Sequence, residues 1–460
     1  MRNLLIIFFI FSFLIFSCDL FNINDSDKSG NFWAIDYKTG MFYRVDAELL
    51  SDKSEYCNVW VEKGSGISKE IANEIADEYD KKIRGIMIEN FSMEDIIFHN
   101  NQYSDTLALA DALGNNDGKL CILLLDIRDT YEKGGNDSYV AGYFFPADLE
   151  RYYNSNMRDI IYIDTNPGMI DVFPDKMDTV YKTLVHEMQH LMNYTSSKVK
   201  RNGSQMDTWI DEGLSAAAEY IYSGHSDYRL DWFRYNGSNP SNDLKNLRGV
   251  IDQGNNFFVW NNRRGNDPGQ SPYAVLDDYA TVYLFFQWLR IHQEENQNIY
   301  RDIITSAYSD YRAVTTSFGN KPWEDILMTW LAANYINAKT GLYGYKDDPE
   351  LKNIMVPAPA SIGTSVQLAP GEGVYSKVSV NPDVTSTAFI GYKYMTSTIN
   401  SSFQANSVLL TFNKNTGKTP ALSTGATTGV PIQPAVNNVS LGRSLLPSNY
   451  APYPIGAGDL

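Results

Sequence analysis

The sequence predicts an α+β protein, and three regions of different character along the chain support this prediction. Residues 31–175 hold short strand-like apolar runs around one amphipathic helix, residues 176–350 are dominated by helical patterns, and residues 355–460 are poor in charge and rich in strand-like segments. A chain of 460 residues is long enough for two or three domains. We therefore expect a mixed α/β front half, a helical second half and a small C-terminal β-sandwich-like module.

The N-terminus carries a targeting signal rather than part of the fold. Arg2 precedes an apolar run over residues 4–16, and Ser17 and Cys18 follow that run. A short charged region, an apolar region of secretory length and a small residue at the break are typical of a signal peptide. The run is also shorter than the roughly 20 residues of a transmembrane helix. A cysteine directly after a small residue resembles the lipobox of bacterial lipoproteins, in which the cysteine becomes the acylated first residue.

A lipid anchor on Cys18 would place the protein outside the cytoplasm, attached to the bacterial membrane and facing the periplasm or the cell surface. Residues 1–17 would then be a signal peptide, and the polar residues 18–30 would form a tether. The alternative interpretation is a plain signal peptide, or an uncleaved anchor, that happens to contain a cysteine.

The predicted elements of the front half alternate between strands and one helix. Ser68 can cap a helix that reaches about residue 83, because the apolar residues from Ile71 to Tyr79 share one face. The strand-like runs are residues 32–35, 41–45, 57–61, 119–126 and 159–164.

Cys57 and Cys121 lie in two of these predicted strands. An oxidising compartment would permit a disulfide between them, but spacing along the chain does not establish proximity. A pair of small buried core residues is an equally good interpretation.

The second half is predicted to be helical and the C-terminal part to be strand-rich. Candidate helices cover residues 176–194, 208–223, 276–292, 298–308 and 322–338. Strand-like runs follow at residues 375–380, 386–394 and 407–412. The tail beyond about residue 415 has few aromatic anchors, and we expect part of it to be disordered.

The helix predicted at residues 176–194 contains the motif HExxH, formed by His186, Glu187 and His190. Residues four apart lie one turn apart on the same helix face, so both imidazoles can reach one metal ion. Glu187, beside the first histidine, can act as the general base that takes a proton from a metal-activated water. The motif alone has many chance matches, so a third ligand is needed before it carries weight.

Glu212 is the candidate for that third ligand. It follows His190 by 22 residues, which leaves room for a turn and an antiparallel second helix. Two imidazoles and a carboxylate leave the fourth position of a zinc ion open, as in catalytic sites. The alternative is that Glu212 only complements the helix dipole in the first turn. Glu219, seven residues further on, would share its face and could orient a histidine ligand, or it could be a solvated glutamate.

These residues resemble a known family. HExxH followed by WIDEGLSAAAEY is similar to the gluzincin clan of zinc peptidases, and HEMQHLMNY resembles the hyicolysin family of bacterial secreted metallopeptidases, from about residue 57 to residue 345. The resemblance implies a gluzincin fold, one zinc ion held by His186, His190 and Glu212, and Glu187 as general base. Asp211 stands where many relatives have asparagine.

Competing classes of zinc peptidase fit less well. A metzincin needs a third histidine six residues after the second, and that position is Ser196. The inverted motif HxxEH is absent. The sequence also has no loop of the GxMEN type, which holds the substrate amine in related aminopeptidases. An endopeptidase acting on protein or peptide substrates is therefore the preferred interpretation.

Two further roles have weaker candidates. The first is the donor to the oxyanion of the tetrahedral intermediate, for which Tyr279 is our first choice, His225 the second and Tyr283 a further candidate. For the two tyrosines, the alternative is packing on an apolar helix face. The loop 114–118 could hold Ca²⁺, as secreted metallopeptidases often do, but it lacks the spacing of an EF-hand and is first of all a turn. His99 and His292 are interpreted as ordinary surface or structural residues.

Net charge excludes some partners and leaves one alternative function. The 55 acidic and 38 basic side chains give a formal charge of −17, which argues against a nucleic-acid partner and against electrostatic attachment to anionic lipid. The alternative to a peptidase is a surface adhesin that keeps the peptidase scaffold, with the C-terminal module as its binding element. An adhesin that had lost catalysis would be expected to lose a ligand or Glu187, and none is lost.

Overall fold

The computed structural model describes residues 29–51, 53–133, 139–172, 177–225, 229, 257–258, 275–352, 354, 366–368, 370–382, 384, 388–417 and 423–425. The signal peptide, Cys18 and most of the tether predicted from the sequence lie outside these residues, as does the tail from residue 426 onward. Within the described part of the chain, none of the helices combines the length and the apolar character needed to span a bilayer.

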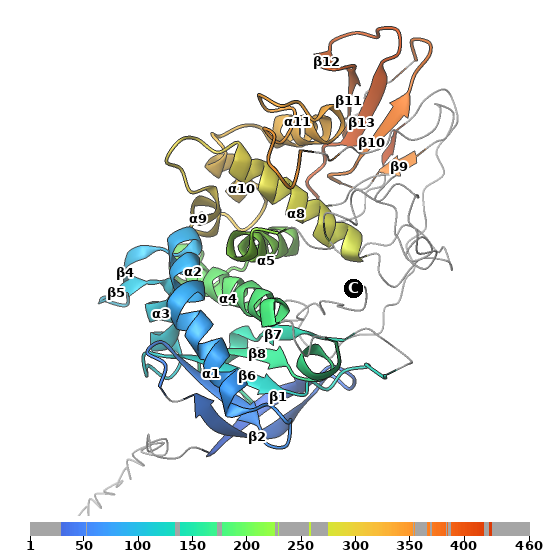
Figure 1. Ribbon diagram of the computed structural model, residues 1–460. Helices are drawn as coiled ribbons and strands as arrows, with labels where there is room; N and C mark the ends of the chain where they lie inside the picture. The colour runs from blue at the N-terminus through green and yellow to red at the C-terminus, as the bar shows by residue number, and fades with distance from the viewer. Residues whose placement is uncertain are drawn as a thin grey trace, which may run out of the picture.

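A six-stranded mixed sheet forms the base of the molecule (Figure 1). Three strands at one side are antiparallel, the central pairs β3–β6 and β6–β8 are parallel, and β7 adds an antiparallel edge. Every residue of β6 and β8 is buried, as expected of strands covered on both faces. In spatial order the strands are β1 (Ser29–Asp36), β2 (Met41–Ser51), β3 (Cys57–Glu62), β6 (Leu120–Leu125), β8 (Ile160–Asp164) and β7 (Gly142–Phe144).

The sheet curls so that its first and last strands meet. The Ile35 N–H of β1 donates to the Tyr143 hydroxyl of β7, 3.1 Å away, although the two strands lie at opposite ends of the strand order. Tyr143 in turn stacks on Tyr162 of β8, with ring centroids 4.1 Å apart. Side chains on the inner face of the sheet therefore pack against one another in an aromatic core, and the helices pack on the outer face.

Cys57 and Cys121 are free thiols on opposite faces of this sheet. Cys121 pairs in register with Asn58, so it is offset by one residue from Cys57 on the neighbouring strand. Because side chains alternate between faces along a strand, this offset turns the two sulfurs apart. Cys57 packs in the core beneath the helices, and Cys121 packs in the inner core. The two cysteines are therefore small buried core residues, which was the alternative to a disulfide between them.

The first helical segment is longer than the sequence suggested. Ser68 caps α1 (Lys69–Glu78) by accepting the Ile71 N–H, and a π-helical turn over Tyr79–Ile83 leads directly into α2 (Arg84–Phe91). The predicted end near residue 83 is therefore wrong by about two turns, because the apolar face continues through Met87 and Phe91 into the same core. A hairpin of β4 (Glu94–Phe98) and β5 (Asn101–Asp105) and the helix α3 (Thr106–Leu113) complete the front half.

Three helices are stacked above the sheet: α4 (Met177–Lys200), α5 (Thr208–Ser223) and α8 (Val275–Ile291). The helix α4 contacts β7 and β8 below and α5 above, and α5 contacts α8 (Figure 1). The short helix α9 (Ile299–Ile304) contacts α8, and α10 (Tyr311–Ser317) contacts α9 and the longer α11 (Trp323–Ile336), whose tryptophan rings pack against α8. Rings from these helices and from Phe257 make edge-on and tilted contacts in one aromatic core built around Trp209, Phe257, Phe285, Trp323 and Trp330.

The C-terminal strands are packed on α11. The Tyr375 hydroxyl donates to the Leu331 carbonyl at 2.7 Å, and the Tyr375 ring stacks on Tyr335 with centroids 5.5 Å apart. The strands form one four-stranded antiparallel sheet and one two-stranded sheet. Their order is β10 (Gly373–Lys377), β13 (Val408–Asn413), β11 (Ile390–Met395) and β12 (Ile399–Asn400), and then β14 (Ser423–Gly425) beside β9 (Val366–Leu368). The observed sheet and helices confirm the α+β class.

Gly213 allows α5 and α8 to approach closely. A methyl group built on Gly213 would lie 2.4 Å from Cε2 of Phe286, which is itself fully buried. We expect Gly213→Ala to lower the free energy of unfolding by about 1–3 kcal/mol through overpacking. The matched control is Gly85→Ala in α2, where nothing lies within 4 Å of the added methyl group and alanine is the better helix former. Urea unfolding of both variants measures the difference; equal destabilisation would show that the α5–α8 contact is not tight.

His292, directly after α8, is a buried neutral histidine. Its Nε2–H donates to the Gly344 carbonyl at 2.8 Å, and burial, aided by Lys346 and Lys321, lowers its pKa to about 4. In the unfolded chain a histidine titrates near pH 6.5, so between these values the unfolded state binds the extra proton. The free energy of unfolding should therefore fall as the pH decreases from about 6.5 to 4.

The variant His292→Gln keeps an N–H donor for Gly344 and cannot titrate in this range. Urea unfolding of both proteins between pH 7.5 and pH 4.5, with chelator present, should show that the wild type loses more stability than the variant as the pH falls. Parallel curves would contradict the buried neutral histidine.

Candidate metal centre

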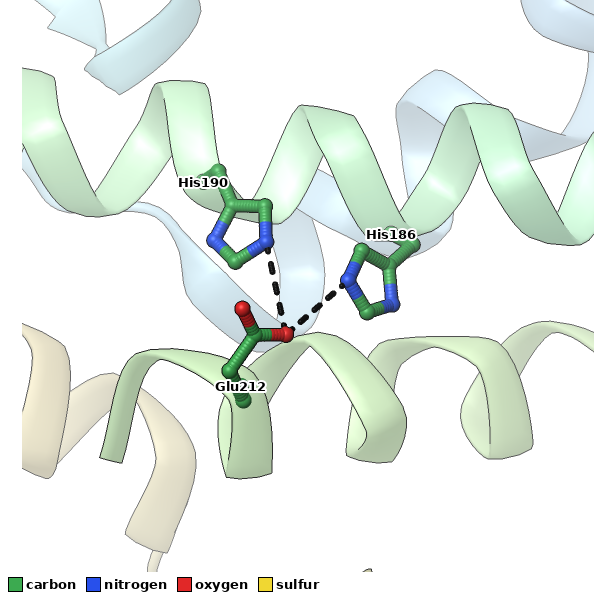
Figure 2. A group of neighbouring side chains, drawn as sticks. All are labelled: His186, His190 and Glu212. Atoms are coloured by element: carbon green, nitrogen blue, oxygen red, sulfur yellow. Dashed lines mark ion pairs between the residues drawn. The ribbon is translucent and has the colours of Figure 1, made fainter. Parts of the chain in front are cut away.

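Two facing helices bring three ligand-type side chains together (Figure 2). His186 and His190 lie one turn apart on α4 and point toward α5, from which Glu212 points back between them. The Glu212 Oε2 lies 3.3 Å from the His186 Nε2 and 3.7 Å from the His190 Nε2. The lead-in from Met177 has no glycine or proline, so the helix carrying both histidines is unbroken.

The geometry of the three side chains fits a metal ion. Within the described part of the chain, His186, His190 and Glu212 form the one group of potential ligands whose atoms all lie within 4.8 Å of one another. Atoms bound tetrahedrally at roughly 2.0–2.1 Å from an ion would lie about 3.4 Å apart, close to the observed separations. Glu212 is 3% exposed, and among the described residues its Oε2 faces the two histidine Nε2 atoms and has no other hydrogen-bond donor. A buried oxygen in that state is costly unless a cation satisfies it.

The imidazole of His186 is held from behind by a carboxylate. Its Nδ1 lies 2.6 Å from the Glu219 Oε1, so the Nδ1–H donates to Glu219 and the Nε2 faces Glu212. Burial alone would raise the pKa of Glu219, but Arg229 and then His186 outweigh burial and keep the pKa below its ordinary value. Glu219 is thus an ionised acceptor that fixes the ring orientation of His186.

The imidazole of His190 has a separate support. Its Nδ1 lies 3.1 Å from the Asp211 Oδ2, and the Asn193 amide donates to the other oxygen of Asp211 at 2.5 Å. Arg201, 7% exposed, donates to the Asn193 Oδ1 at 3.0 Å. Burial would raise the pKa of Asp211, but the charge and hydrogen bond of His190 lower it. Each histidine therefore presents its Nε2 to Glu212 because a carboxylate binds its Nδ1.

The charges of this centre call for a cation. Four carboxylates, those of Glu187, Asp211, Glu212 and Glu219, are gathered with two arginines, Arg201 and Arg229. With neutral imidazoles this leaves two negative charges, which one divalent ion would balance. In the metal-free protein the histidines instead take up protons. Burial lowers their pKa, but the surrounding carboxylates raise it to about 9 for His186 and about 10 for His190.

Glu187 is buried beside the three ligand-type residues, with 4% of its surface exposed. Burial raises the pKa of its carboxyl group, and the charges of His186 and His190 oppose that rise. The backbone N–H of Phe144 on β7 also opposes that rise in pKa. A carboxylate in this position is available as a proton acceptor next to the candidate metal.

The candidate oxyanion donors lie further along the chain. Tyr279 is buried on α8, and its ring faces Arg229, whose guanidinium carbon is 5.7 Å from the ring centroid. Tyr283, also buried on α8, has its ring against Tyr220. His225 is exposed just after α5, where its backbone N–H donates to the Ser223 hydroxyl.

The remaining sequence candidates have structural environments. In the loop 114–118, the Gly118 N–H donates to Asp111 and the Lys119 N–H donates to Asp117, as in a turn. His99 is exposed at the tip of the β4–β5 hairpin, and its ring contacts Phe98.

Sequence patterns missed the residues that support the histidines. Asp211 stands out in the sequence only as a departure from the related motif, and no motif marks Asn193, Arg201 or Arg229. The spacing of Asn193, three residues after His190 and therefore on a neighbouring part of the helix surface, could have pointed to it. Arg229 has no such signal, because its place beside Glu219 is set by tertiary packing and not by spacing within one helix.

Comparison with known proteins agrees with a metal-dependent peptidase. No family model matches the sequence. The chain is 28% identical over 332 residues to the neutral metalloprotease ShpI of Staphylococcus hyicus, and the match covers 70% of this chain and 66% of that relative. The chain thus spans slightly less than two thirds of the relative's length. This similarity supports a relationship to metallopeptidases and a metal cofactor.

A divalent metal ion should stabilise the protein only while Glu212 is intact. A ligand at 100 times its Kd that binds the folded state alone adds about 2.7 kcal/mol. We expect Zn²⁺ added to chelator-treated protein to raise the Tm of the wild type and of the control Glu295→Gln, an exposed site with the same chemical change. Glu212→Gln should show little or no rise in scanning calorimetry. An equal rise in Glu212→Gln would place the metal elsewhere.

Proposed function

We propose that this protein is a zinc-dependent endopeptidase of the hyicolysin family. The observation that carries the proposal is the convergence of His186, His190 and Glu212 beside the buried carboxylate of Glu187. Two imidazoles and one carboxylate are a ligand set used by catalytic zinc, which keeps one coordination position open. The similarity to a neutral metalloprotease supports the same chemistry.

In this proposal His186, His190 and Glu212 hold the zinc ion. Zinc held in this way supplies a Lewis acid that lowers the pKa of water and polarises the scissile carbonyl group. The remaining chemistry belongs to the protein. Glu187 takes a proton from the attacking water and delivers it to the leaving nitrogen of the peptide bond. The backbone N–H of Phe144 favours the ionised form of Glu187 that this role needs.

The oxyanion formed during attack also needs a donor. Tyr279 stays our first candidate and His225 the second. Tyr279 lies in the layer directly above α5, and its ring faces the arginine that binds Glu219. His225 is exposed just past the C-terminal end of α5, and the helix from Glu212 to that end is about 16 Å long, so His225 is the weaker candidate.

We also propose that the enzyme acts outside the cytoplasm as a bacterial lipoprotein anchored through Cys18. The support is the charged start, the short apolar run and the small residue before Cys18. The protein or peptide substrates would then be extracytoplasmic. For an adhesin on a peptidase scaffold we find no specific supporting observation, since the ligand-type residues and Glu187 are all retained.

Glu187→Gln tests the mechanism. The amide keeps the shape of the side chain and leaves the ligand-type residues untouched, but it cannot accept a proton. We expect the variant to retain about one zinc ion per chain by elemental analysis and to lose casein cleavage by at least roughly 10²–10⁴-fold, the usual contribution of a general base.

The control Glu295→Gln should cleave casein like the wild type, and mass spectrometry of a peptide library should show cleavage at internal bonds. Full casein cleavage by Glu187→Gln would refute the proposed role of Glu187. Release of terminal residues alone would refute the endopeptidase assignment.

A further inference from the structure

Arg229 is a buried cation that binds both oxygens of one carboxylate. It is 3% exposed, its Nη2–H donates to the Glu219 Oε1 at 2.8 Å, and its Nη1–H donates to the Glu219 Oε2. A two-pronged contact of this kind fixes the plane of a carboxylate as well as its position. Glu219 is in turn the group that receives the Nδ1–H of His186 at 2.6 Å.

The arginine is placed from two sides. Glu219 belongs to α5, the helix that carries Glu212, and the guanidinium carbon lies 5.7 Å from the ring centroid of Tyr279 on α8. An arginine near a tyrosine ring gains a cation–π contribution, which is larger when both groups are withdrawn from water. Arg229 therefore links the α5–α8 layer to the imidazole of His186 through a single carboxylate.

The two histidines differ in this respect. Asp211, the partner of His190, receives a neutral amide from Asn193, and Arg201 donates to that amide oxygen and to backbone carbonyls rather than to Asp211 itself. Glu219 has the full cation in direct contact. Without Arg229, Glu219 would be a buried carboxylate free to rotate away from His186 or toward the metal, and the tautomer of His186 would no longer be fixed.

We infer that Arg229 is a positioning residue of the metal centre, which clamps Glu219 so that Glu219 can only orient His186. The inference rests on the proposed zinc site and adds a residue that never touches the metal. Loss of Arg229 should weaken the affinity for zinc, because a His186 side chain that is not held in the binding tautomer must reorganise each time an ion binds.

The test is a double-mutant cycle on zinc affinity in the full chain. Arg229→Met removes the charge and both donors, Glu219→Gln removes the acceptor, and the double variant removes both. Competition with a chromophoric chelator gives the Kd for Zn²⁺ of each protein. We expect Arg229→Met to weaken zinc binding by roughly 10–100-fold, the usual effect of removing such support. The double variant should bind zinc no worse than Glu219→Gln alone, because Arg229 acts through Glu219.

Two further variants separate positioning from general stability. Arg290→Met removes another partly buried arginine, paired with Asp348 at 3.4 Å, and should leave the Kd for zinc unchanged even if the metal-free Tm falls. Arg229→Lys keeps the charge but not the two-pronged contact, so its Kd should lie between those of the wild type and Arg229→Met. If Arg229→Met does not fold, Arg229→Lys still gives a measurable Kd.

Either of two outcomes would overturn this inference alone. In the first, the Kd for Zn²⁺ of Arg229→Met, or of Arg229→Lys if only that variant folds, lies within twofold of the wild-type value. In the second, the effects of Arg229→Met and Glu219→Gln add fully in the double variant. In both cases the wild type would still bind zinc and cleave casein, so the proposed function would stand. A wild type that binds no zinc would overturn both proposals together.

Discussion

The whole arrangement depends on one buried electrostatic contact, in which the Glu212 carboxylate of one helix lies between the Nε2 atoms of two histidines on the next. Three polar groups placed in the seam between two packed helices would ordinarily cost stability. They are tolerated because each has a partner or a ligand to bind. The separation of α4 and α5 therefore sets the distances between the Glu212 carboxylate and the two imidazoles.

Packing above the centre enforces that separation. Gly213, the residue after Glu212, lets Phe286 of α8 lie directly against α5, and Trp209 joins the same aromatic core one turn earlier. Below, β7 contacts α4, the helix that carries Glu187. The curled sheet and the aromatic core are thus the two surfaces between which the site is held, which suits a function that needs side chains fixed in position.

Sequence reasoning reached the parts of this centre that local spacing encodes. The interval between His186 and His190 is a helical turn, and that relation holds wherever the helix packs. The position of Glu212 required the further assumption of an antiparallel return, and the structure has that return. Arg229 was out of reach because its contact with Glu219 is set by tertiary packing. The same limit applied to Cys57 and Cys121, whose separation on two faces follows from a strand register that no spacing reveals.

The central claim is that one zinc ion is bound jointly by His186, His190 and Glu212. The most direct measurement is X-ray diffraction from crystals of the wild-type protein, with data collected on both sides of the zinc absorption edge. The account predicts a single strong anomalous peak within roughly 2.0–2.2 Å of the two Nε2 atoms and a Glu212 oxygen. Density for zinc at another place, or a Glu212 side chain turned away from both imidazoles in zinc-loaded crystals, would contradict it.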